Sequence, residues 1–539
     1  MNRTTNIPAL SGTFQEAPSI ESRLLALYRR YRNMYLFTFL CGMLAHLFVF
    51  TNVVQNNDNA YYITEGYGVG ITSARWLLEI ITDLFPLFWG GSQNNTSFNG
   101  VFALLILSAC ACIIARLFGM EQRLEGWLWG AVFVCFPTTT TTFFYIYAAP
   151  LYALMLLLSA WAIKLADERP RGWIAGVFIV AAVLGVYQPF LPLIASILVV
   201  LVIRSILDGK ETVRELIVRS LRFVGLLAGS IVVYMVILKI YLAWSGAKLS
   251  TYRGVDRIGQ FRGFKATYEI IKAEYKNFLL LPFQDYMGVT CTPAIRAALI
   301  VMIILTAVAL IWVFVRRCDK PRKILLLLTV GVLPFTVNAI LLMSPDADIY
   351  TMMEYGLATV FLVPLAVMAR VRHLPEESLS GRLMHAYTSK GRTILAAAYV
   401  VLILNYAWVA SVNYTSMYYT TQLSTSYATT LITQVKSTEG YDPSYPWAII
   451  GKKIRDWRNF HNDWGASLGV MRLGGNMTRL LNCYSWYEFI AAHTGYHVGL
   501  ADPFTMEDMA NREEVQNMPV YPNDGSIRII DGFVVIRAQ

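Results

Sequence analysis

Charged residues are scarce in this chain, and their scarcity excludes an ordinary soluble protein. Asp, Glu, Lys and Arg together make up 15% of the 539 residues, whereas hydrophobic residues make up 56%. A soluble domain carries roughly 25% charged residues. Lipid is therefore the expected solvent for most of the chain. The net charge of +10 is then best explained by the excess of Lys and Arg on cytoplasmic loops, so no nucleic-acid partner is expected.

Paired cysteines are also missing. The seven cysteines include no Cys-x-x-Cys pair, and most stand inside apolar runs, where cysteine behaves as a small hydrophobe. Neither a disulfide framework nor a zinc site is expected. The first 18 residues are polar and the first apolar run, which begins near Met34, has the length of a span, so we expect no cleavable signal peptide.

Apolar runs recur along residues 34–413. About eleven of them approach the roughly 20 residues that cross a bilayer as a helix, with boundaries uncertain by a few residues. We therefore predict an α-helical polytopic membrane protein. The expected spans are 34–54, 99–118, 127–144, 148–165, 172–187, 189–207, 223–243, 297–315, 323–343, 355–370 and 393–413.

Lys and Arg gather in alternate connections between these runs. Basic loops stay on the cytoplasmic side of a membrane, so the N-terminus and these connections are expected inside. An odd number of spans then places residues 414–539 outside. Within the N-terminal segment 1–33, residues 21–33 are expected to form a short basic helix on the cytoplasmic leaflet. The basic segments are 21–33, 116–126, 164–172, 204–222, 316–323 and 370–392.

The tail 414–539 contains no span-length apolar run. In residues 526–537 the pair Asp531-Gly532 separates two β-branched runs, which predicts a hairpin with a two-residue turn. The aromatic stretch 441–447 could form another strand. We predict a small extracytoplasmic α/β domain of about 120 residues. It could be a passive cap, or it could bind a glycan through its aromatic residues, which include Tyr441, Tyr445, Trp447, Trp457, Trp464 and Trp486.

The first outer loop, residues 55–98, begins with polar residues. Asp58 follows the first span directly, among amides that include Asn57. A carboxylate at this boundary could act as a general base on a hydroxyl group, or it could cap a turn. Further along, polar residues recur every three or four positions, which predicts a helix lying flat on the outer leaflet. These polar residues are Thr72, Arg75, Glu79 and Asp83.

Two further outer loops carry charge. The loop 246–296 holds nearly all the basic residues of the outer loops, which could bind a phosphate group or attract anionic lipid. The loop 344–354 carries Asp346 and Asp348, which could bind a polar substrate or a metal, or form a solvated turn. At a short outer turn, Tyr187-Gln188 could line a cavity. The basic candidates are Arg253, Arg257, Arg262 and Lys265.

This layout is similar to that of the GT-C class of membrane glycosyltransferases. More narrowly, residues 34–415 resemble the bacterial and phage-encoded O-antigen glucosyltransferases that convert serotype. The residues that carry the resemblance are Asn57-Asp58, Ala74-Arg75-Trp76 and Tyr187-Gln188. Family members often show Asn-Asp-Asp and Gly-Arg-Trp. The absent second acid leaves Asp58 as the sole acidic candidate in that motif.

The resemblance implies transfer of a sugar, with glucose as the expected one, from undecaprenyl phosphate. The acceptor would be a lipopolysaccharide O-antigen or another surface glycan, at the periplasmic face of the bacterial inner membrane. Asp58 would be the base, commonly with inversion, and Arg75 with the four basic-loop residues would bind the donor phosphate. Arginine can supply this charge, so no cofactor is expected and a divalent metal is possible but not required. The expected substrate-binding residues are Asn57, Glu79, Tyr187, Gln188, Asp346 and Asp348.

Two other functions compete with this interpretation. A flippase or transporter for a lipid-linked glycan would need polar residues well inside several spans, and the expected spans are nearly free of them. A polymerase or ligase of surface polysaccharide would also combine many spans with outer arginines. The early acidic loop and the outer tail favour the transferase.

Overall fold

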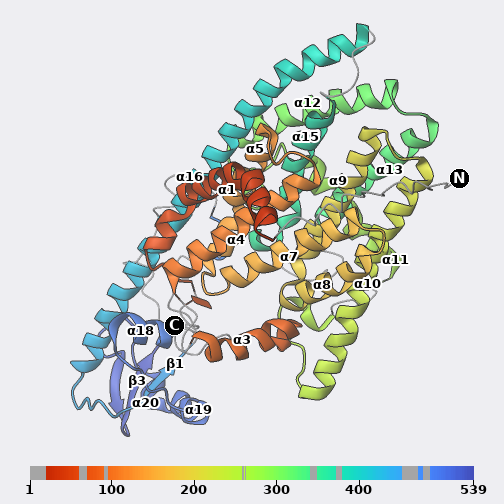
Figure 1. The fold of residues 1–539 in the computed structure, drawn as a ribbon. Coiled ribbons are helices and arrows are strands. Elements are labelled where there is room, and N and C mark those ends of the chain that lie inside the picture. Colours follow the sequence, from red (N-terminus) through yellow and green to blue (C-terminus); the bar gives the residue numbers. More distant parts are fainter. Residues whose placement is uncertain are drawn as a thin grey trace, which may run out of the picture.

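Long apolar helices make up most of the molecule (Figure 1). The computed structural model describes residues 20–56, 58–59, 70–89, 95–257, 260, 263–339, 349–371, 379–451, 472–476 and 486–538. The bundle helices are α1 (Ile20–Thr51), α4 (Thr96–Leu117), α5 (Leu124–Cys135), α6 (Pro137–Phe144), α7 (Ala149–Glu168), α8 (Gly172–Val186), α9 (Leu191–Asp208), α10 (Val213–Ser245), α12 (Pro293–Arg316), α13 (Lys320–Val337), α15 (Ala358–Val371) and α16 (Leu379–Lys436).

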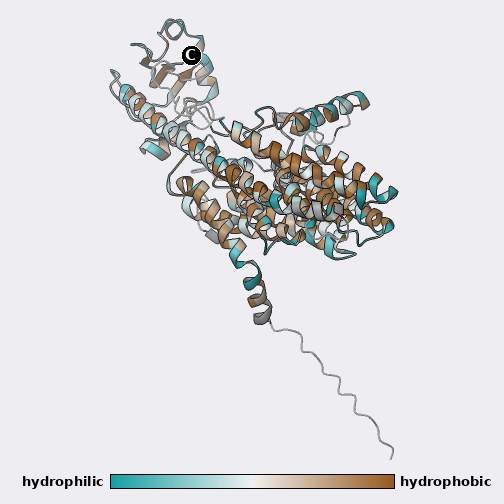
Figure 2. Cartoon of the chain, turned by 90° about the horizontal axis from the view of Figure 1, so that it is seen from above, coloured by the Kyte–Doolittle hydropathy of each residue, from teal (hydrophilic) through white to brown (hydrophobic). Residues whose placement is uncertain are grey.

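The remaining helices of this part lie in connections. They are α3 (Trp76–Trp89), α11 (Phe264–Leu280) and the 3-10 helices η1 (Ile71–Ser73), η2 (Gln188–Phe190), η3 (Tyr252–Arg257), η4 (Thr351–Met353) and η5 (Tyr355–Leu357). Each predicted span overlaps a bundle helix. Within the described ranges, seven helices are long and apolar enough to cross a membrane. The protein is therefore a polytopic membrane protein, and the count of about eleven crossings stays a prediction. Hydrophobic residues dominate the bundle in Figure 2.

Several helices differ from the predicted boundaries. Residues 21–33 do not form a separate surface helix, because α1 runs unbroken from Ile20 and no glycine or proline interrupts it before Gly42. The expected span 127–144 is split into α5 and α6 at Pro137, which has no N–H to continue the helix. The last helix does not end at residue 413, since α16 continues to Lys436.

The tail forms a small sheet with helices against the far part of α16 (Figure 1). Its strands are β1 (Trp447–Ile450), β2 (Ile527–Ile530) and β3 (Phe533–Arg537), in the order β1-β3-β2, and its helices are α18 (Trp486–Thr494), α19 (Pro503–Asn511) and α20 (Glu513–Gln516). The predicted hairpin is present, with positive φ at both Asp531 and Gly532. The strand at Trp447 is also present and pairs in parallel with β3.

Two of the tail's tryptophans are core residues. Trp447 is 1% exposed and Trp486 is 8% exposed, and both pack against Leu431 and neighbouring residues of α16. The buried face of α16 explains why this polar stretch stays helical beyond the bundle. These two side chains are therefore unavailable to bind a glycan. Trp457 and Trp464 lie outside the described residues.

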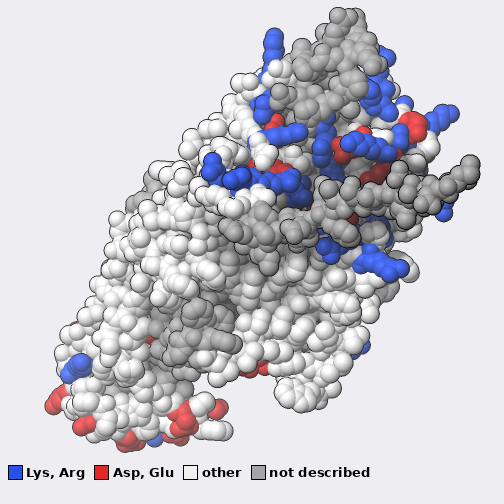
Figure 3. All heavy atoms as spheres, in the orientation of Figure 1, with Lys and Arg blue, Asp and Glu red and all other residues white. Residues whose placement is uncertain are grey.

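Ion pairs tie together one end of the bundle. All six segments predicted to lie on the same side of the membrane take part, which confirms that they share one end. Figure 3 shows Lys and Arg gathered there, far from the tail sheet, with a broad uncharged band between. We call the opposite end, which carries α3 and η4, the outer end. The contacts include Arg30–Glu121, Arg392–Glu125, Arg204–Asp167, Arg219–Glu211 and Arg370–Asp208, with Arg322 donating to the Glu211 carbonyl.

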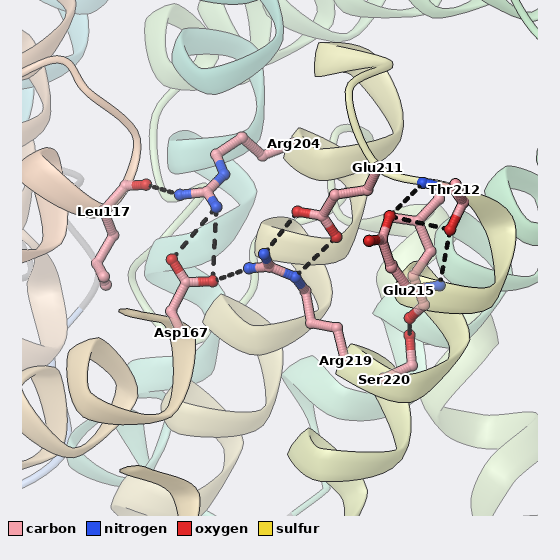
Figure 4. Close-up of polar contacts among 9 residues, drawn as sticks. Leu117, Asp167, Arg204, Glu211, Thr212, Glu215, Arg219 and Ser220 are labelled. Atoms are coloured by element: carbon pink, nitrogen blue, oxygen red, sulfur yellow. Dashed lines mark hydrogen bonds and ion pairs between the residues drawn. The ribbon is translucent and has the colours of Figure 1, made fainter. Parts of the chain in front are cut away.

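Asp167 lies between two arginines of this network (Figure 4). Its carboxylate accepts from Arg204 at 3.2 Å and also from Arg219, and its side chain is 7% exposed. Arg219 also reaches Glu211, so a single row of alternating charges joins α7, α9 and α10. A buried acid between two arginines is costly to remove, because both cations lose their counter-charge.

We expect Asp167→Asn to lower the free energy of unfolding by about 2 kcal/mol or more, measured by thermal or denaturant unfolding of the purified protein in detergent. The neighbouring Glu168 provides the control, because it pairs with Lys164 at 3.1 Å but is 41% exposed. Glu168→Gln should change stability by about 0.5 kcal/mol or less. Equal effects of the two substitutions would contradict the proposed contribution of the Asp167 ion pairs to stability.

Candidate active site at the outer end of the bundle

The break between α5 and α6 is stabilised by side chains from other elements. Pro137 offers no N–H to the Phe133 carbonyl, and the end of α5 leaves the Val134 carbonyl without its helical donor as well. The Thr139 hydroxyl donates to the Phe133 oxygen at 2.9 Å, and His46 Nε2 lies 2.8 Å from the Val134 oxygen. The bond to a carbonyl requires a proton on Nε2. An unsatisfied carbonyl would be costly at this buried position, so these contacts hold the break in place.

The other end of α6 anchors the first outer loop. The side-chain amides of Asn56 and Asn59 both donate to the Phe144 oxygen, at 3.1 and 2.6 Å, and the Asn59 N–H donates to the Asn56 side chain at 2.8 Å. Both asparagines are buried, and Asp58 between them is half-buried. The predicted base is thus held at the outer end by an amide clamp. Asn57 lies outside the described residues.

A wall of aromatic side chains extends from α6 along the outer end. The Thr142 hydroxyl lies 2.6 Å from the Tyr355 hydroxyl. The Tyr355 ring packs edge-on against Phe190 with 5.4 Å between centroids, and Phe190 packs against Tyr187 at 5.1 Å. These rings are buried. They connect α6, which holds the loop of Asp58, to Tyr187, on which Arg75 packs.

Arg75 rests on this wall, and its neighbours hold the backbone beside it. Its guanidinium carbon lies 5.0 Å from the centre of the Tyr187 ring, within cation–π range. Ala74 has a left-handed backbone, φ 59°, and its carbonyl accepts from Gln188 and from the Tyr234 hydroxyl, both at 2.9 Å. Tyr187 and Gln188 therefore position Arg75. Their predicted contact with substrate stays a prediction.

A helix is present in the predicted stretch as α3, which begins after Thr72 and Arg75. Glu79 at its start accepts a hydrogen bond from the Ile71 N–H, which closes the preceding turn. On the face toward the bundle, Trp76 packs over Gly185, where an added Cβ would lie 2.6 Å from the indole ring. Near the far end of the helix, Leu87 is 77% exposed. The start of α3 therefore packs on the bundle, whereas its far end presents a large apolar side chain outward.

The basic loop is attached close to Arg75. The Ser250 N–H donates to the Thr72 carbonyl at 2.8 Å, which brings η3 to the first outer loop. Arg257 in η3 is exposed and lies 3.9 Å from Asp256. Lys265 is exposed at the start of α11. Outside the described part lie Arg262, the Arg253 side chain, Asp346 and Asp348.

Part of the tail also reaches the outer end. Asn413 of α16 accepts from the Leu473 N–H and from the Asn476 side chain, both at 2.9 Å. The Gly474 N–H donates to the Thr351 hydroxyl at 3.3 Å. The tail segment 472–476 is therefore packed against η4 beside the clamp of Asp58, a contact that no local sequence pattern indicated.

The sequence reasoning also missed a pair of buried acids, Glu274 and Glu354. Each is 1% exposed, and Tyr286 donates a hydrogen bond to Glu354 at 3.3 Å. Burial raises the pKa of Glu274 to about 9, with repulsion from Glu354 adding to the effect. Burial raises the pKa of Glu354 to about 7, against the opposing effect of the Tyr286 hydrogen bond. The available signal was an acid among the apolar residues of α11, between Ile271 and Phe278.

The residues that the structure describes contain no group of three His, Cys, Asp or Glu side chains arranged to hold a metal ion. The outer end offers a half-buried carboxylate, Asp58, and a positioned guanidinium, Arg75. Such a pair suits proton abstraction from a hydroxyl group and stabilisation of an anionic leaving group.

The bundle and its polar outer end define an α-helical membrane protein with an enzyme-like surface site. A family model described as Glucosyl transferase GtrII matches residues 47–361, which is more than half of the chain. The chain belongs to the GtrII glucosyl transferase family, and it is a membrane glucosyltransferase for a surface glycan. The resemblance to the serotype-converting enzymes is thereby confirmed, over a shorter range than 34–415. No curated protein and no solved structure matches the chain.

We expect Asn59→Ala to loosen the loop that carries Asp58, because the Phe144 carbonyl would keep only one of its two amide donors. The loss of this buried hydrogen bond should lower the free energy of local opening by about 1–2 kcal/mol. Amide exchange in residues 54–59, measured by hydrogen–deuterium exchange, should therefore become roughly tenfold faster. Asn52→Ala is the control, since that side chain donates to Phe48 in its own helix at 2.9 Å. Unchanged exchange in the Asn59 variant would contradict the clamp.

His46→Ala should destabilise the protein by about 1–3 kcal/mol, because the Val134 carbonyl loses its donor at the break before α6. The loss would appear as a lower midpoint of thermal unfolding in detergent. Leu44→Ala, on the same helix but 67% exposed, should have a smaller effect. Similar midpoints for the two variants would show that the break does not depend on His46.

Proposed function

We propose that the protein transfers glucose from undecaprenyl phosphate to a lipopolysaccharide O-antigen or another surface glycan. The reaction would take place at the periplasmic face of the bacterial inner membrane, which is the outer end of the bundle. Family membership supplies glucosyl transfer. The proposed lipid-linked donor, the acceptor and the place of reaction rest on one observation. The buried amide clamp holds Asp58 at the end of an apolar bundle, and Arg75 lies on the connected aromatic wall.

A lipid-linked donor suits this architecture. Its polyprenyl chain is apolar and would stay among the bundle helices, whose outward faces carry large exposed hydrophobic residues such as Ile240 and Trp244 of α10. Its phosphate and sugar would be held at the bundle end, where a water-soluble acceptor can reach them. The ion pairs at the opposite end join the segments richest in Lys and Arg, which supports a cytoplasmic location for that end.

The proposed mechanism uses Asp58 as the general base. Its carboxylate would take the proton from the acceptor hydroxyl as that oxygen attacks the anomeric carbon, and the bond from this carbon to the donor phosphate would break. Attack from the face opposite the phosphate inverts the configuration. The transition state has oxocarbenium character, as in other glycosyl chemistry.

Charge that develops on the leaving phosphate would be stabilised by Arg75. The ring of Tyr187 beneath the guanidinium and the hydrogen bonds at Ala74 fix its position before substrate arrives, which reduces the cost of reorganisation. The basic loop would add further positive charge, because the bond from Ser250 to Thr72 holds it close by. Its proposed contributors are Arg253, Arg257, Arg262 and Lys265, with no metal required at the phosphate.

The other proposed substrate-binding residues fall into two groups. Glu79, Tyr187 and Gln188 make internal contacts that hold the first loop and Arg75 in position, and they also remain proposed substrate contacts. Asn57, Asp346 and Asp348 remain proposed contacts for the sugar or the acceptor. Asn57 is next to Asp58, and the two aspartates precede η4 in the chain.

Replacement of Asp58 by Asn tests the proposed base. We expect transfer from labelled undecaprenyl-phosphate glucose to an O-antigen acceptor to fall by about 10²- to 10⁴-fold in membrane vesicles, with normal insertion. Asp83→Asn is the control, because Asp83 is an exposed acid on α3 of the same loop, and it should retain near-normal transfer. Full activity of the Asp58 variant would exclude Asp58 as the general base. If the wild type transferred no glucose in this assay, a flippase or a polysaccharide ligase would be favoured instead.

A further inference from the structure

Four oxygen atoms at one corner of the outer end are buried without a hydrogen-bond partner. The side chains that carry them are almost inaccessible, at 1% exposure for Glu274, 1% for Glu354 and 2% for Asn338. Unpartnered buried oxygens are rare in folded proteins, and each one asks for an explanation. The atoms are both carboxylate oxygens of Glu274, Oε2 of Glu354 and Oδ1 of Asn338.

These side chains come from three elements that meet at this corner. Helix α11, which carries Glu274, is bound to α13 through the Tyr275 hydroxyl, which donates to the Gly331 carbonyl at 2.6 Å. Gly356 packs on the end of α13, since an added Cβ there would lie 3.0 Å from the carbonyl carbon of Val337. Asn338 is the next residue after Val337, and Glu354 is two residues before Gly356.

The corner holds two carboxyl groups without a matching cation. In the described part of the chain, neither Glu274 nor Glu354 forms an ion pair with Lys, Arg or His. The Tyr286 hydroxyl satisfies only Oε1 of Glu354. Burial of an unpaired carboxylate is costly, and two neighbouring carboxylates increase that cost.

Binding of a proton would reduce the cost of burying these carboxylates only in part. One proton neutralises one carboxylate and satisfies one acceptor oxygen, whereas a divalent cation neutralises both carboxylates and can contact several oxygens. All the available ligands are carboxylate or amide oxygens, which are the ligands of hard cations such as Mg²⁺ and Ca²⁺. A dehydrated ion is small enough for a nearly inaccessible position that would exclude a sugar.

We infer that Glu274, Glu354 and Asn338 bind one hard divalent cation, Mg²⁺ or Ca²⁺, which fastens α11 to α13 and η4. Tyr286 is a positioning residue that orients the Glu354 carboxylate. The ion would be structural and separate from Asp58 and Arg75, so the inference does not depend on the proposed glucosyl donor or acceptor. Through α11 it would also hold the end of the basic loop.

Cation binding to the purified full-length protein tests this inference. After treatment with chelator, Ca²⁺ and Mg²⁺ are titrated separately by calorimetry, and thermal unfolding is followed with and without each ion. We expect a saturable site in the wild type that raises the unfolding temperature. Glu274→Gln and Glu354→Gln should each weaken binding at least tenfold, and Asn338→Ala should weaken it while both carboxylates remain.

Glu269→Gln is the matched control, because Glu269 lies on the same helix but is 56% exposed and pairs with Lys272. It should bind the ion like the wild type. In chelator, the Glu274 variant should unfold at a higher temperature than the wild type, since one buried carboxyl group without a partner is gone, and the order should reverse when the ion is added. The inference is overturned if the wild type binds neither ion, or if the double Glu274 and Glu354 variant binds as tightly as the wild type.

Discussion

The outer end of this protein depends on how the chain satisfies two carbonyl groups at the Pro137 break. Proline removes the donor that would continue α5, and a hydroxyl from Thr139 and the imidazole of His46 replace the lost hydrogen bonds. Non-helical backbone inside an apolar bundle is tolerated only where such partners exist. Because the break is stabilised, α6 can follow a direction of its own, and its final carbonyl group, that of Phe144, is presented at the outer end.

Several segments from distant parts of the chain then meet around α6. The first loop binds it through Asn56 and Asn59, and η5 binds it through the bond between Thr142 and Tyr355. The tail segment 472–476 packs beside it, held by Asn413 and Thr351. The candidate base and the supports of the candidate phosphate-binding arginine are thus organised around one short helix. A discontinuous helix next to a binding site is a recurring device in membrane proteins, because it exposes backbone groups where the site needs them.

Different kinds of interaction hold the chain together at the two ends of the bundle. At the ion-paired end, rows of alternating charges such as Arg204, Asp167 and Arg219 fasten the helices together (Figure 4). At the outer end, neutral amides, hydroxyls and aromatic rings hold the loops around Asp58 and Arg75. The buried acids Glu274 and Glu354, which form no ion pair in the described part of the chain, stand out against these neutral contacts.

Short-range patterns determined much of this protein from sequence alone. Apolar runs located the helices, the Lys and Arg bias identified the segments that share one end, and Asp531-Gly532 located the tail hairpin, because each signal acts between residues that are neighbours in the chain. Asp58 and Arg75 were predicted as site residues in the same way, from their places after a span and at the start of a helix. Only the tertiary structure decided what surrounds them. The contacts that do so join residues far apart in sequence. They are the bonds of Asn56 and Asn59 to Phe144, the packing of Arg75 on Tyr187, the contacts of residues 472–476 and the meeting of Glu274 with Glu354. Such contacts depend on the packing of the whole bundle and on the need to satisfy its buried polar groups.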